Sequence, residues 1–407
     1  MTAGGGLAGH RARLHAEMER GGAWPADSPW LREAFAALPR DRFAPDRLWR
    51  WDGGAYVPLD RADDPDGWAD ELYSGAHSAA VTQLTGGLPS SSLSAPSVVA
   101  DMLDSLRLEP GHRVWDIGTG QGWTAALASW RAGPGLVVTT EVDESLAASA
   151  RARFVAAGLT VEATAGDGTA GGPPGGSPVD RLHATYAVET VPWSWVEAVR
   201  PGGRIVYPWG RLGHVALTVA DDGQSATGWV QGLAQFMGDR HGPAQAGTGT
   251  AAYAAVRGDA EPETGRALDR DPADLDDWNL RFALRVAVPH AVLLTAPDAD
   301  GTNAWIHDGH RSWAALAARG SGVPPLLSQG GPRRIGDEVL ATWTQWEELG
   351  RPDLYDYGIT VTPDAQWAWQ GDPATRPRWP IGQRGPGADL TAGAASARAL
   401  LKDEAPE

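Results

Sequence analysis

Between residues 110 and 240, short apolar runs alternate with longer stretches in which apolar residues recur at helical spacing. Each apolar run is bounded by Gly, Pro or Asp, which is typical of buried strands. Strands that alternate with helices favour parallel pairing, because a helix then connects each strand to the next. We therefore predict an α/β fold whose centre is a doubly wound, mostly parallel sheet.

The rest of the chain divides by composition. The sequence ahead of the core begins with a helical pattern and continues as a loop rich in Pro, Asp and Gly, and a Gly- and Ala-rich stretch follows the core. Further on, FALRVAVPHAVLLTA, NAWIHDG and GITVTPDAQWAWQ predict strands and DEVLATWTQWEELG predicts a helix, so this part is expected to be α+β. The predicted organisation is an N-terminal helical and loop segment (1–85), the core (86–241), a linker (242–266), an α+β extension (267–384) and a frayed tail (385–407).

The most informative motif is VWDIGTGQGW, in which an apolar strand ends on Asp116 and a glycine turn leads into a helix. Such a turn lets bare backbone approach a nucleotide-like ligand, whose polar groups meet the free N–H groups of the helix start. The glycines fall at alternate positions (Gly118, Gly120 and Gly122), whereas a dinucleotide fingerprint reads G-x-G-x-x-G. This spacing disfavours an NAD dehydrogenase and is similar to motif I of the S-adenosylmethionine (SAM) methyltransferases.

Two further strand ends carry acidic residues in the order that a doubly wound nucleotide site requires. The strand LVVTTEVD ends near Glu141, about 25 residues after Asp116, where such folds place a carboxylate that accepts both ribose hydroxyls. The next strand ends in Gly166-Asp167-Gly168, beside the position expected for an adenine. Solvated strand-end acids without a ligand are the alternative interpretation of Glu141 and Asp167.

Composition removes several classes of function. The net charge is −17 and no block of Lys or Arg stands out, so the electrostatic footprint expected for nucleic acid is missing. The chain has no Cys, which excludes disulfides, thiolate metal sites and Cys nucleophiles, and we predict no metal site. The N-terminus lacks the apolar core of a secretory signal, and no run approaches the ~18 apolar residues of a membrane span. We expect a soluble, cytoplasmic protein that binds neither nucleic acid nor membrane.

Several segments, taken in order, resemble the protein-L-isoaspartate O-methyltransferase family. LREAFAALPRDRFAP is similar to the family's entry helix, SSLSAP to the segment ahead of its motif I, and GDGTAG, DRLHATYAVETVP and RPGGRIVYPWG continue the likeness over residues 28–240. The resemblance implies a Rossmann-like methyltransferase fold, SAM as cofactor, a peptide substrate, and Ser94 in the place of the active-site serine. The cofactor-binding residues that it implies are Ser91, Asp116, Gly118, Thr119, Gly120, Glu141, Asp167 and Gly168.

Two departures from the family pattern lead to a more specific hypothesis. The loop ahead of the serine segment is longer than in the repair enzymes, and the chain beyond residue 241 has no counterpart in the minimal fold. Both features are similar to the methyltransferases of ribosomal peptide natural product (RiPP) biosynthesis in lanthipeptide, lasso and ATP-grasp (graspetide) systems. The main prediction is a SAM-dependent O-methyltransferase that esterifies an aspartate side chain in a modified, constrained precursor peptide, after which the ester closes to an aspartimide. The alternatives are a protein-L-isoaspartate repair methyltransferase and, from a third class, a non-enzymatic SAM-fold protein or a small-molecule methyltransferase.

The predicted reaction does not require a titratable side chain to transfer a proton. A carboxyl group of pKa about 3.9 is ionised at neutral pH and is itself a nucleophile, so no general base is needed. None of the 10 His lies in a catalytic constellation, and His183 is predicted to be packed or solvated. Ser94 would donate a hydrogen bond to the carboxylate oxygen that does not attack. Its alternative role is an N-cap for the helix that starts near Pro96.

Overall fold

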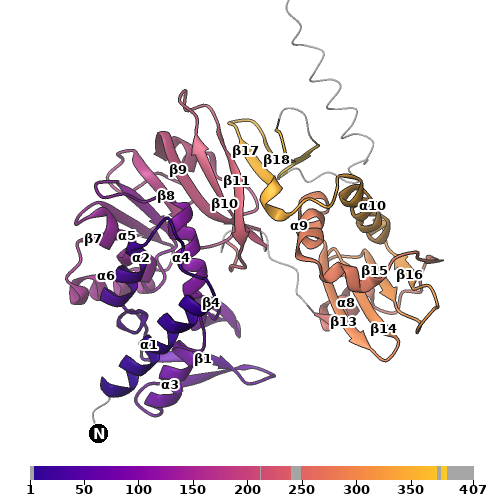
Figure 1. The fold of residues 1–407 in the computed structure, drawn as a ribbon, viewed down its shortest axis with the longest axis horizontal. Coiled ribbons are helices and arrows are strands. Elements are labelled where there is room, and N and C mark those ends of the chain that lie inside the picture. Colours follow the sequence, from indigo (N-terminus) through magenta and orange to yellow (C-terminus); the bar gives the residue numbers. More distant parts are fainter. Residues whose placement is uncertain (1–3, 211, 240–248, 374–376, 383–407) are drawn as a thin grey trace, which may run out of the picture. The chain divides into compact units, whose positions relative to one another are not determined.

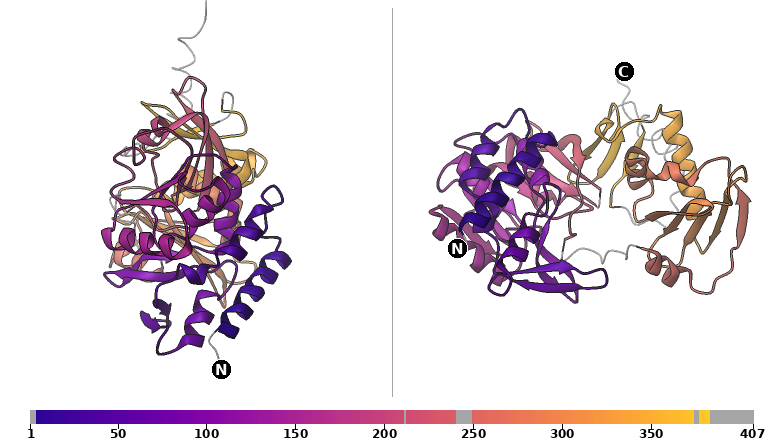
Figure 2. Two further views of the ribbon diagram at one scale, coloured as in Figure 1. Left: turned by 90° about the vertical axis from the view of Figure 1, so that its left-hand side faces the viewer. Right: turned by 60° about the horizontal axis from the view of Figure 1, so that its bottom comes forward.

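The computed structural model describes residues 4–210, 212–239, 249–373 and 377–382. The chain divides into two compact units. The first unit contains the chain up to Asp239 together with Thr360–Ala365, and the second contains Arg240–Ile359 and the chain from Gln366 on. The colours of Figures 1 and 2 follow the sequence from indigo to yellow.

The first unit opens with helices and a small antiparallel sheet of strand order β2-β1-β3-β4. Figure 2 draws this part of the chain in indigo and purple. These elements are α1 (Gly4–Arg20), α2 (Trp30–Ala37), the 3-10 helix η1 (Arg40–Arg42), β1 (Arg47–Trp51), β2 (Tyr56–Asp60), α3 (Pro65–Leu72), β3 (Ala80–Thr85) and β4 (Leu88–Leu93).

This small sheet corrects the prediction that residues 1–85 hold only helices and loop. β1 and β2 form a hairpin whose turn is fixed by Asp52, because Oδ1 accepts hydrogen bonds from the N–H groups of Gly54 (2.9 Å) and Ala55 (2.8 Å). Leu48 and Leu59 lie opposite each other and are buried. Each strand is only five residues long and lies in Pro- and Asp-rich sequence, which masks its period-2 pattern. The predicted boundary at residue 85/86 also divides the β3–β4 hairpin.

The central sheet of the first unit has the strand order β11-β10-β9-β8-β5-β6-β7. Strands β5 to β9 pair in parallel, and β10 and β11 are antiparallel. This arrangement confirms the predicted Rossmann-like α/β fold. Its elements are α4 (Pro96–Ser105), β5 (Val114–Ile117), α5 (Trp123–Ala132), β6 (Val137–Glu141), α6 (Glu144–Ala157), β7 (Val161–Ala165), β8 (Val179–Ala184), α7 (Trp193–Ala198), β9 (Val199–Trp209), β10 (Gly213–Val219) and β11 (Ala226–Leu233).

Side chains pack against both faces of this sheet. Val206 of β9 belongs to the buried cluster that includes α4 and α5. The next residue, Tyr207, points to the opposite face, where its ring lies 6.1 Å from that of Trp195 in α7. The sheet is therefore doubly wound, as predicted.

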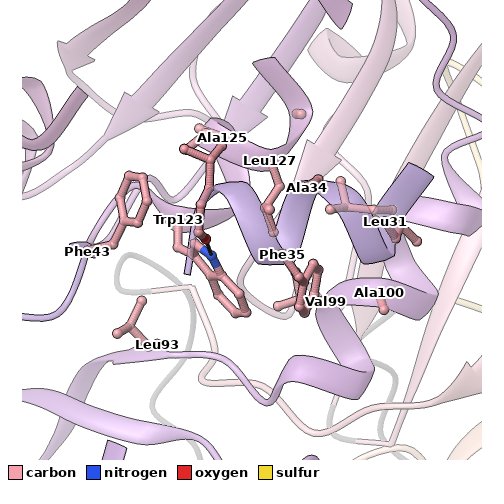
Figure 3. Close-up of a cluster of buried hydrophobic side chains, with 14 of the residues drawn as sticks. Leu31, Ala34, Phe35, Phe43, Leu93, Val99, Ala100, Trp123, Ala125 and Leu127 are labelled. Carbon is pink, nitrogen blue, oxygen red and sulfur yellow. Dashed lines mark hydrogen bonds between the residues drawn. The ribbon is translucent and has the colours of Figure 1, made fainter. Parts of the chain in front are cut away.

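The core on the α4 and α5 face holds the start of α5 in place (Figure 3). Phe35 of α2 meets Trp123 edge to face, with ring centroids 4.9 Å apart. The indole Nε1 of Trp123 donates a hydrogen bond to the carbonyl of Leu38 at 2.9 Å, so this large side chain is buried with its polar atom satisfied. Figure 3 also places Leu93, at the end of β4, beside this cluster.

The second unit is built on an antiparallel sheet of order β12-β16-β15-β14-β13. The predicted helix DEVLATWTQWEELG lies within α10 except for its last two residues, and the predicted strand NAWIHDG lies within β14 except for its last two residues. The elements in this part of the chain are α8 (Thr250–Arg257), β12 (Thr264–Ala267), η2 (Pro272–Asp276), α9 (Trp278–Ala287), β13 (Val292–Asp298), β14 (Gly301–His307), β15 (Trp313–Ala317), β16 (Leu326–Gly330), α10 (Ile335–Glu348), η3 (Leu354–Asp356), β17 (Tyr357–Val361), β18 (Gln366–Gln370) and β19 (Arg378–Pro380).

Two predictions for this part of the chain are wrong. The predicted linker 242–266 contains α8, whose buried Tyr253 lies edge to face with Trp313 at 6.1 Å; residues 242–248 of that span lie outside the described part. The segment FALRVA, predicted as strand, belongs to α9. The side chain of Asp277 accepts hydrogen bonds from two N–H groups at the start of this helix, and this cap outweighs the apolar run that suggested a strand.

None of the helices in the described ranges is long and apolar enough to cross a membrane. The predicted tail, 385–407, lies outside the described residues.

Candidate functional site

The candidate site lies at the carboxyl ends of the parallel strands β5, β6, β7 and β8. β5 has β6 on one side and β8 on the other, so the strand order reverses next to β5. Figure 1 labels β7 and β8, which lie on the two sides of this reversal. In open α/β sheets, ligands bind outside the carboxyl ends of the strands at such a reversal.

The turn between β5 and α5 requires glycine at two positions. Gly118 has φ +85°, and a Cβ there would lie 2.6 Å from Oγ1 of Thr185 and 2.9 Å from the ring of Tyr186. Gly122 has φ +90° and is the N-cap residue of α5, and a Cβ there would lie 2.8 Å from the ring of Phe154. Both positions combine a left-handed backbone with close neighbours, so backbone alone forms this part of the site.

Glu141, at the end of β6, is buried and joins this turn. Its Oε2 accepts a hydrogen bond from the N–H of Gly120 at 2.8 Å, and its Oε1 accepts one from the N–H of Asp143 at 3.1 Å. Each carboxylate oxygen can accept a second hydrogen bond. The arrangement therefore fits a ligand with two neighbouring hydroxyls, such as a ribose.

The Asp167–Gly168 turn after β7 is held from behind by α7. The side chain of Asp167 accepts hydrogen bonds from the N–H and the hydroxyl of Thr169, at 2.8 and 2.7 Å. Trp195 donates from Nε1 to the carbonyl of Gly168 at 2.8 Å. A Cβ at Gly168 would lie 2.1 Å from Cγ2 of Ile117, so glycine allows the turn to pack directly on β5.

Asp116 and Thr119 lie beneath the glycine turn and take part in one buried polar chain. Oδ2 of Asp116 accepts a hydrogen bond from the hydroxyl of Thr139 at 2.8 Å, and Oδ1 lies 3.1 Å from Nδ1 of His183. The hydroxyl of Thr119 lies 2.6 Å from that of Thr139. These side chains point into the fold, so they support the turn from below, and a direct contact of the Asp116 side chain with a cofactor stays an untested prediction.

Ser91 and Gln121 connect β3 and β4 to the glycine turn. The hydroxyl of Ser91 lies 3.6 Å from the place that a Cβ of Gly120 would take, and Ser91 is buried. The side chain of Gln121 donates from Nε2 to the hydroxyl of Thr82 at 3.0 Å, while its buried Oε1 has no partner among the described residues. The structure thus brings Ser91 to the turn, as the predicted site requires, although its contact with a cofactor is untested.

Ser94 follows β4 directly and precedes α4. The N-cap residue of α4 is Ala95, and no side chain caps this helix, so the alternative role of Ser94 as an N-cap is wrong. Its carbonyl accepts a hydrogen bond from Nη2 of Arg40 at 3.3 Å. The side chain is half-buried, and its contact with a substrate remains a prediction.

Two residues at the site were not among the predicted ones. Tyr186 comes two residues after β8, and its ring covers Gly118 while its hydroxyl lies 3.5 Å from the place of a Gly168 Cβ. Arg40 lies under the Leu93–Ser94 backbone. The strand-end position of Tyr186 and the presence of Arg40 in LREAFAALPRDRFAP are signals that could have drawn attention to them.

Electrostatics distinguish the groups around the turn. Burial raises the pKa of Tyr186, and the carboxylates of Asp239, Asp167 and Glu141 raise it further, so the phenol stays a neutral donor. Burial alone would raise the pKa of Asp143, but hydrogen bonds from its neighbours hold it below its usual range. Within the described residues, no group of three or more His, Asp or Glu could hold a metal ion.

Comparison with known sequences agrees with this geometry. The family model described as Protein-L-isoaspartate(D-aspartate) O-methyltransferase (PCMT) matches residues 68–231, inside the span 28–240 of the predicted resemblance. A protein-L-isoaspartate O-methyltransferase of Xanthobacter autotrophicus is 42% identical over 119 residues, which are 29% of this chain and 53% of that protein. One of Methylorubrum extorquens is 34% identical over 188 residues, which are 46% of this chain and 68% of that protein. The chain thus spans about half the length of the first of these curated relatives and about two thirds of the second.

Among solved structures, one titled protein-L-isoaspartate O-methyltransferase is 18% identical, with a TM-score of 0.47 over 89% of this chain and 100% of that chain.

Proposed function

This chain belongs to the protein-L-isoaspartate O-methyltransferase family, and we propose that it transfers a methyl group from SAM to the free carboxylate of an isoaspartyl residue in a peptide or protein. The observation that carries the proposal is the buried Glu141 carboxylate, bound to the glycine turn through Gly120 at the carboxyl end of the sheet. A cytoplasmic location is part of this proposal and rests on the sequence alone.

The residues present fit SAM. Glu141 would accept the two ribose hydroxyls, Gly118 and Gly120 would let the backbone approach the cofactor, and Asp167 with Gly168 would lie beside the adenine. Bound there, SAM supplies a methyl group on a sulfonium. Ser91 would line the site, whereas Thr119 and Asp116 would act through the backbone of the turn that they support.

The chain's own part in the reaction is to bind and orient the acceptor. The acceptor carboxylate is ionised at neutral pH, so no side chain needs to remove a proton. Ser94 would donate its hydroxyl hydrogen to the carboxylate oxygen that does not attack, which aligns the other oxygen with the methyl group. Tyr186, with its raised pKa, covers the turn as a neutral ring and helps to exclude water.

The ester product then reacts without the protein. The N–H of the following peptide bond attacks the ester carbonyl, methanol leaves, and a five-membered succinimide forms. The same ring forms from an isoaspartyl ester and from an ester of an aspartate side chain. The chemistry after methylation therefore leaves the choice of acceptor open.

A second candidate function is modification of an aspartate in a constrained, ribosomally made peptide, with an aspartimide as the product. One observation favours it: the chain has a second folded unit, which begins at Arg240 and lies outside the matched residues 68–231. Repair of many exposed sites does not require an additional module, whereas recognition of one folded peptide can use it. The family relatives support the repair activity better, so this candidate stands second.

Three peptides distinguish the two functions: a short isoaspartyl peptide, a linear aspartyl peptide and its macrocyclised form. We expect methyl transfer from radiolabelled SAM to the isoaspartyl peptide at a rate at least ~10-fold above either aspartyl peptide, equivalent to ~1.4 kcal/mol in the barrier. Preference for the macrocyclic aspartyl peptide would replace repair by peptide modification. SAM binding without transfer to any of the three would contradict both functions and leave a small-molecule enzyme or a non-enzymatic protein.

A further inference from the structure

Arg40 is a fully buried arginine whose guanidinium lies under the backbone of Ser94, the predicted active-site serine. Its Nη2 donates hydrogen bonds to two consecutive carbonyls, those of Leu93 (3.1 Å) and Ser94 (3.3 Å), and its Nη1 lies 3.5 Å from the carbonyl of Ser78. One planar group thus fixes the backbone on which the Ser94 hydroxyl is carried.

The same guanidinium connects this backbone to the cofactor side. Its carbon lies 5.5 Å from the ring centroid of Trp123, the first residue of α5 after the glycine turn. Trp123 is itself fixed by its hydrogen bond to the carbonyl of Leu38. Movement of the Leu93–Ser94 backbone relative to the start of α5 would therefore break several contacts at once.

The charge of Arg40 is not balanced within the described part of the chain. The neighbouring carboxylate, Asp41, is used by Arg11 at 2.6 and 2.8 Å and by Tyr73, and no described acid lies within ion-pair distance of Arg40. Its Nε has no partner among the described residues. Burial lowers the pKa of Arg40 to about 10, which still leaves the group charged at neutral pH. A buried unpaired charge is costly, so its presence under a functional serine calls for an anion that is not part of the fold.

We propose that Arg40 is the positioning residue for the methyl acceptor: its bonds to the Leu93 and Ser94 carbonyls orient the serine, and its unbalanced positive charge attracts the acceptor carboxylate. This inference rests on the proposed carboxylate methylation. Charge explains why an anion binds and a neutral product leaves. The attacking oxygen forms the O–CH3 bond with its own electron pair, the electron pair of the S–CH3 bond returns to sulfur, and no proton moves. The acceptor thereby changes from −1 to 0 and no longer interacts with Arg40 as an ion.

Two variants separate the charge from the geometry. Arg40→Lys keeps the charge, but a single ammonium cannot reproduce a planar group that bonds two carbonyls and stacks on Trp123. Arg40→Gln removes the charge. The matched control is Arg131→Lys, because Arg131 also lies over a Trp ring (Trp30, 5.7 Å) and donates to a backbone carbonyl (Leu108, 3.0 Å) outside the site.

The binding readout is calorimetry with S-adenosylhomocysteine (SAH) present, comparing an isoaspartyl peptide with the same peptide carrying a carboxamide in place of the free carboxylate. The unmodified protein should bind the carboxylate at least ~10-fold more tightly, Arg40→Lys should keep this preference within ~3-fold, and Arg40→Gln should lose it. SAH affinity should stay within ~3-fold in all variants. Equal binding of the two peptides by the unmodified protein would overturn the charge argument without any variant having to fold.

The kinetic readout is a double-mutant cycle with Ser94→Ala. Arg40→Lys should lower kcat by at least ~10-fold in the unmodified background and by no more than ~3-fold when Ser94 is already Ala, because Arg40 acts through Ser94. Fully additive losses of kcat in the double variant would contradict the inference that Arg40 acts through Ser94. Arg131→Lys is expected to lower the melting temperature only. If the Arg40 variants also do no more than this, Arg40 has a structural role and the inference is contradicted. Methyl transfer by the unmodified protein would still support the proposed function. Selective carboxylate binding that depends on Arg40, without methyl transfer, would contradict the function and leave the charge argument intact.

Discussion

On the cofactor side of the candidate site, the carboxylate of Glu141 is held by the N–H groups of Gly120 and Asp143, so a negative charge is balanced by local backbone. On the acceptor side, the cation of Arg40 contacts the carbonyls of Leu93, Ser94 and Ser78 and the ring of Trp123, but no carboxylate among the described residues lies within ion-pair distance of it. One side is complete before any ligand binds, and the other is completed by an anion.

This difference follows from what each ligand brings. A ribose presents hydroxyls, which need acceptors of fixed geometry, and a carboxylate held by backbone supplies them. A substrate carboxylate brings its own charge, and the site must then offset its loss of hydration. We expect substitutions on the cofactor side to act through geometry and those on the acceptor side to act through charge and orientation.

The largest effect is expected for Gly118→Ala. Its new Cβ would need φ +85° and would lie within 3 Å of both Thr185 and Tyr186, so the turn must move. SAH affinity measured by calorimetry should fall by at least ~100-fold, because the backbone can no longer approach the ligand.

The matched control for this variant is Gly111→Ala. Gly111 has φ +89° and nothing within 4 Å of a new Cβ, so it carries the backbone strain alone, about 1–2 kcal/mol of stability, and should leave SAH affinity unchanged. If the two variants reduce SAH binding equally, close packing at Gly118 is not what forms the cofactor side.

A smaller effect is expected for Glu141→Gln. The amide keeps one oxygen acceptor but places an NH2 group against the N–H of Gly120 or Asp143, so one buried donor loses its partner. SAH affinity should fall by about 1–3 kcal/mol, and Glu144→Gln, which removes the same charge from an exposed position nearby, should change it little. Unchanged affinity in Glu141→Gln would remove this residue from the ribose site.

The comparison of the two sides also explains how much of the fold and of the candidate site could be predicted from the sequence alone. The cofactor side depends on local backbone, so the spacing of Gly118, Gly120 and Gly122 and the strand-end acids were enough to predict both the fold and the position of Glu141. Asp116 was predicted at the same site, but its side chain points into the fold, because a strand-end residue faces one side of the sheet according to its register. Sequence spacing alone does not distinguish the two directions.

The acceptor side depends on contacts between distant segments. Arg40 meets Leu93 and Ser94 across more than fifty residues, and Ser91 reaches the glycine turn only because β4 pairs with β3. The same limit explains the errors elsewhere. FALRVA is helical because Asp277 caps the helix that contains it, and the hairpin around Asp52 is too short for its alternation to outweigh its polar composition.

The last prediction concerns the interior beneath α4, the helix that follows Ser94. Asp101 on α4 lies 3.8 Å from Nε2 of the buried His214, which also lies 3.3 Å from the hydroxyl of Ser105. Burial, together with the smaller effect of the neighbouring His183, lowers the pKa of His214 to about 3. Burial raises the pKa of Asp101 to about 6, with Asp104 adding to the effect.

Between about pH 6 and pH 4, the two pKa shifts change the free energy of unfolding in opposite directions. In this range the unfolded chain carries a proton on His214 and none on Asp101, whereas the folded chain carries one on Asp101 and none on His214. His214 therefore stabilises the fold fully above its unfolded pKa, and this stabilisation is lost as pH falls; Asp101 contributes with the opposite sign.

His214→Gln should gain about 1.4 kcal/mol of stability per pH unit relative to the unmodified protein as the medium is acidified, because the folded and unfolded states then no longer differ by the proton on His214. Asp101→Asn should lose stability on acidification by less than half of that, since its carboxyl is partly exposed and screened. Urea unfolding at pH 6, 5 and 4 measures both slopes, and slopes of the same sign for the two variants would contradict the opposing pKa shifts of His214 and Asp101.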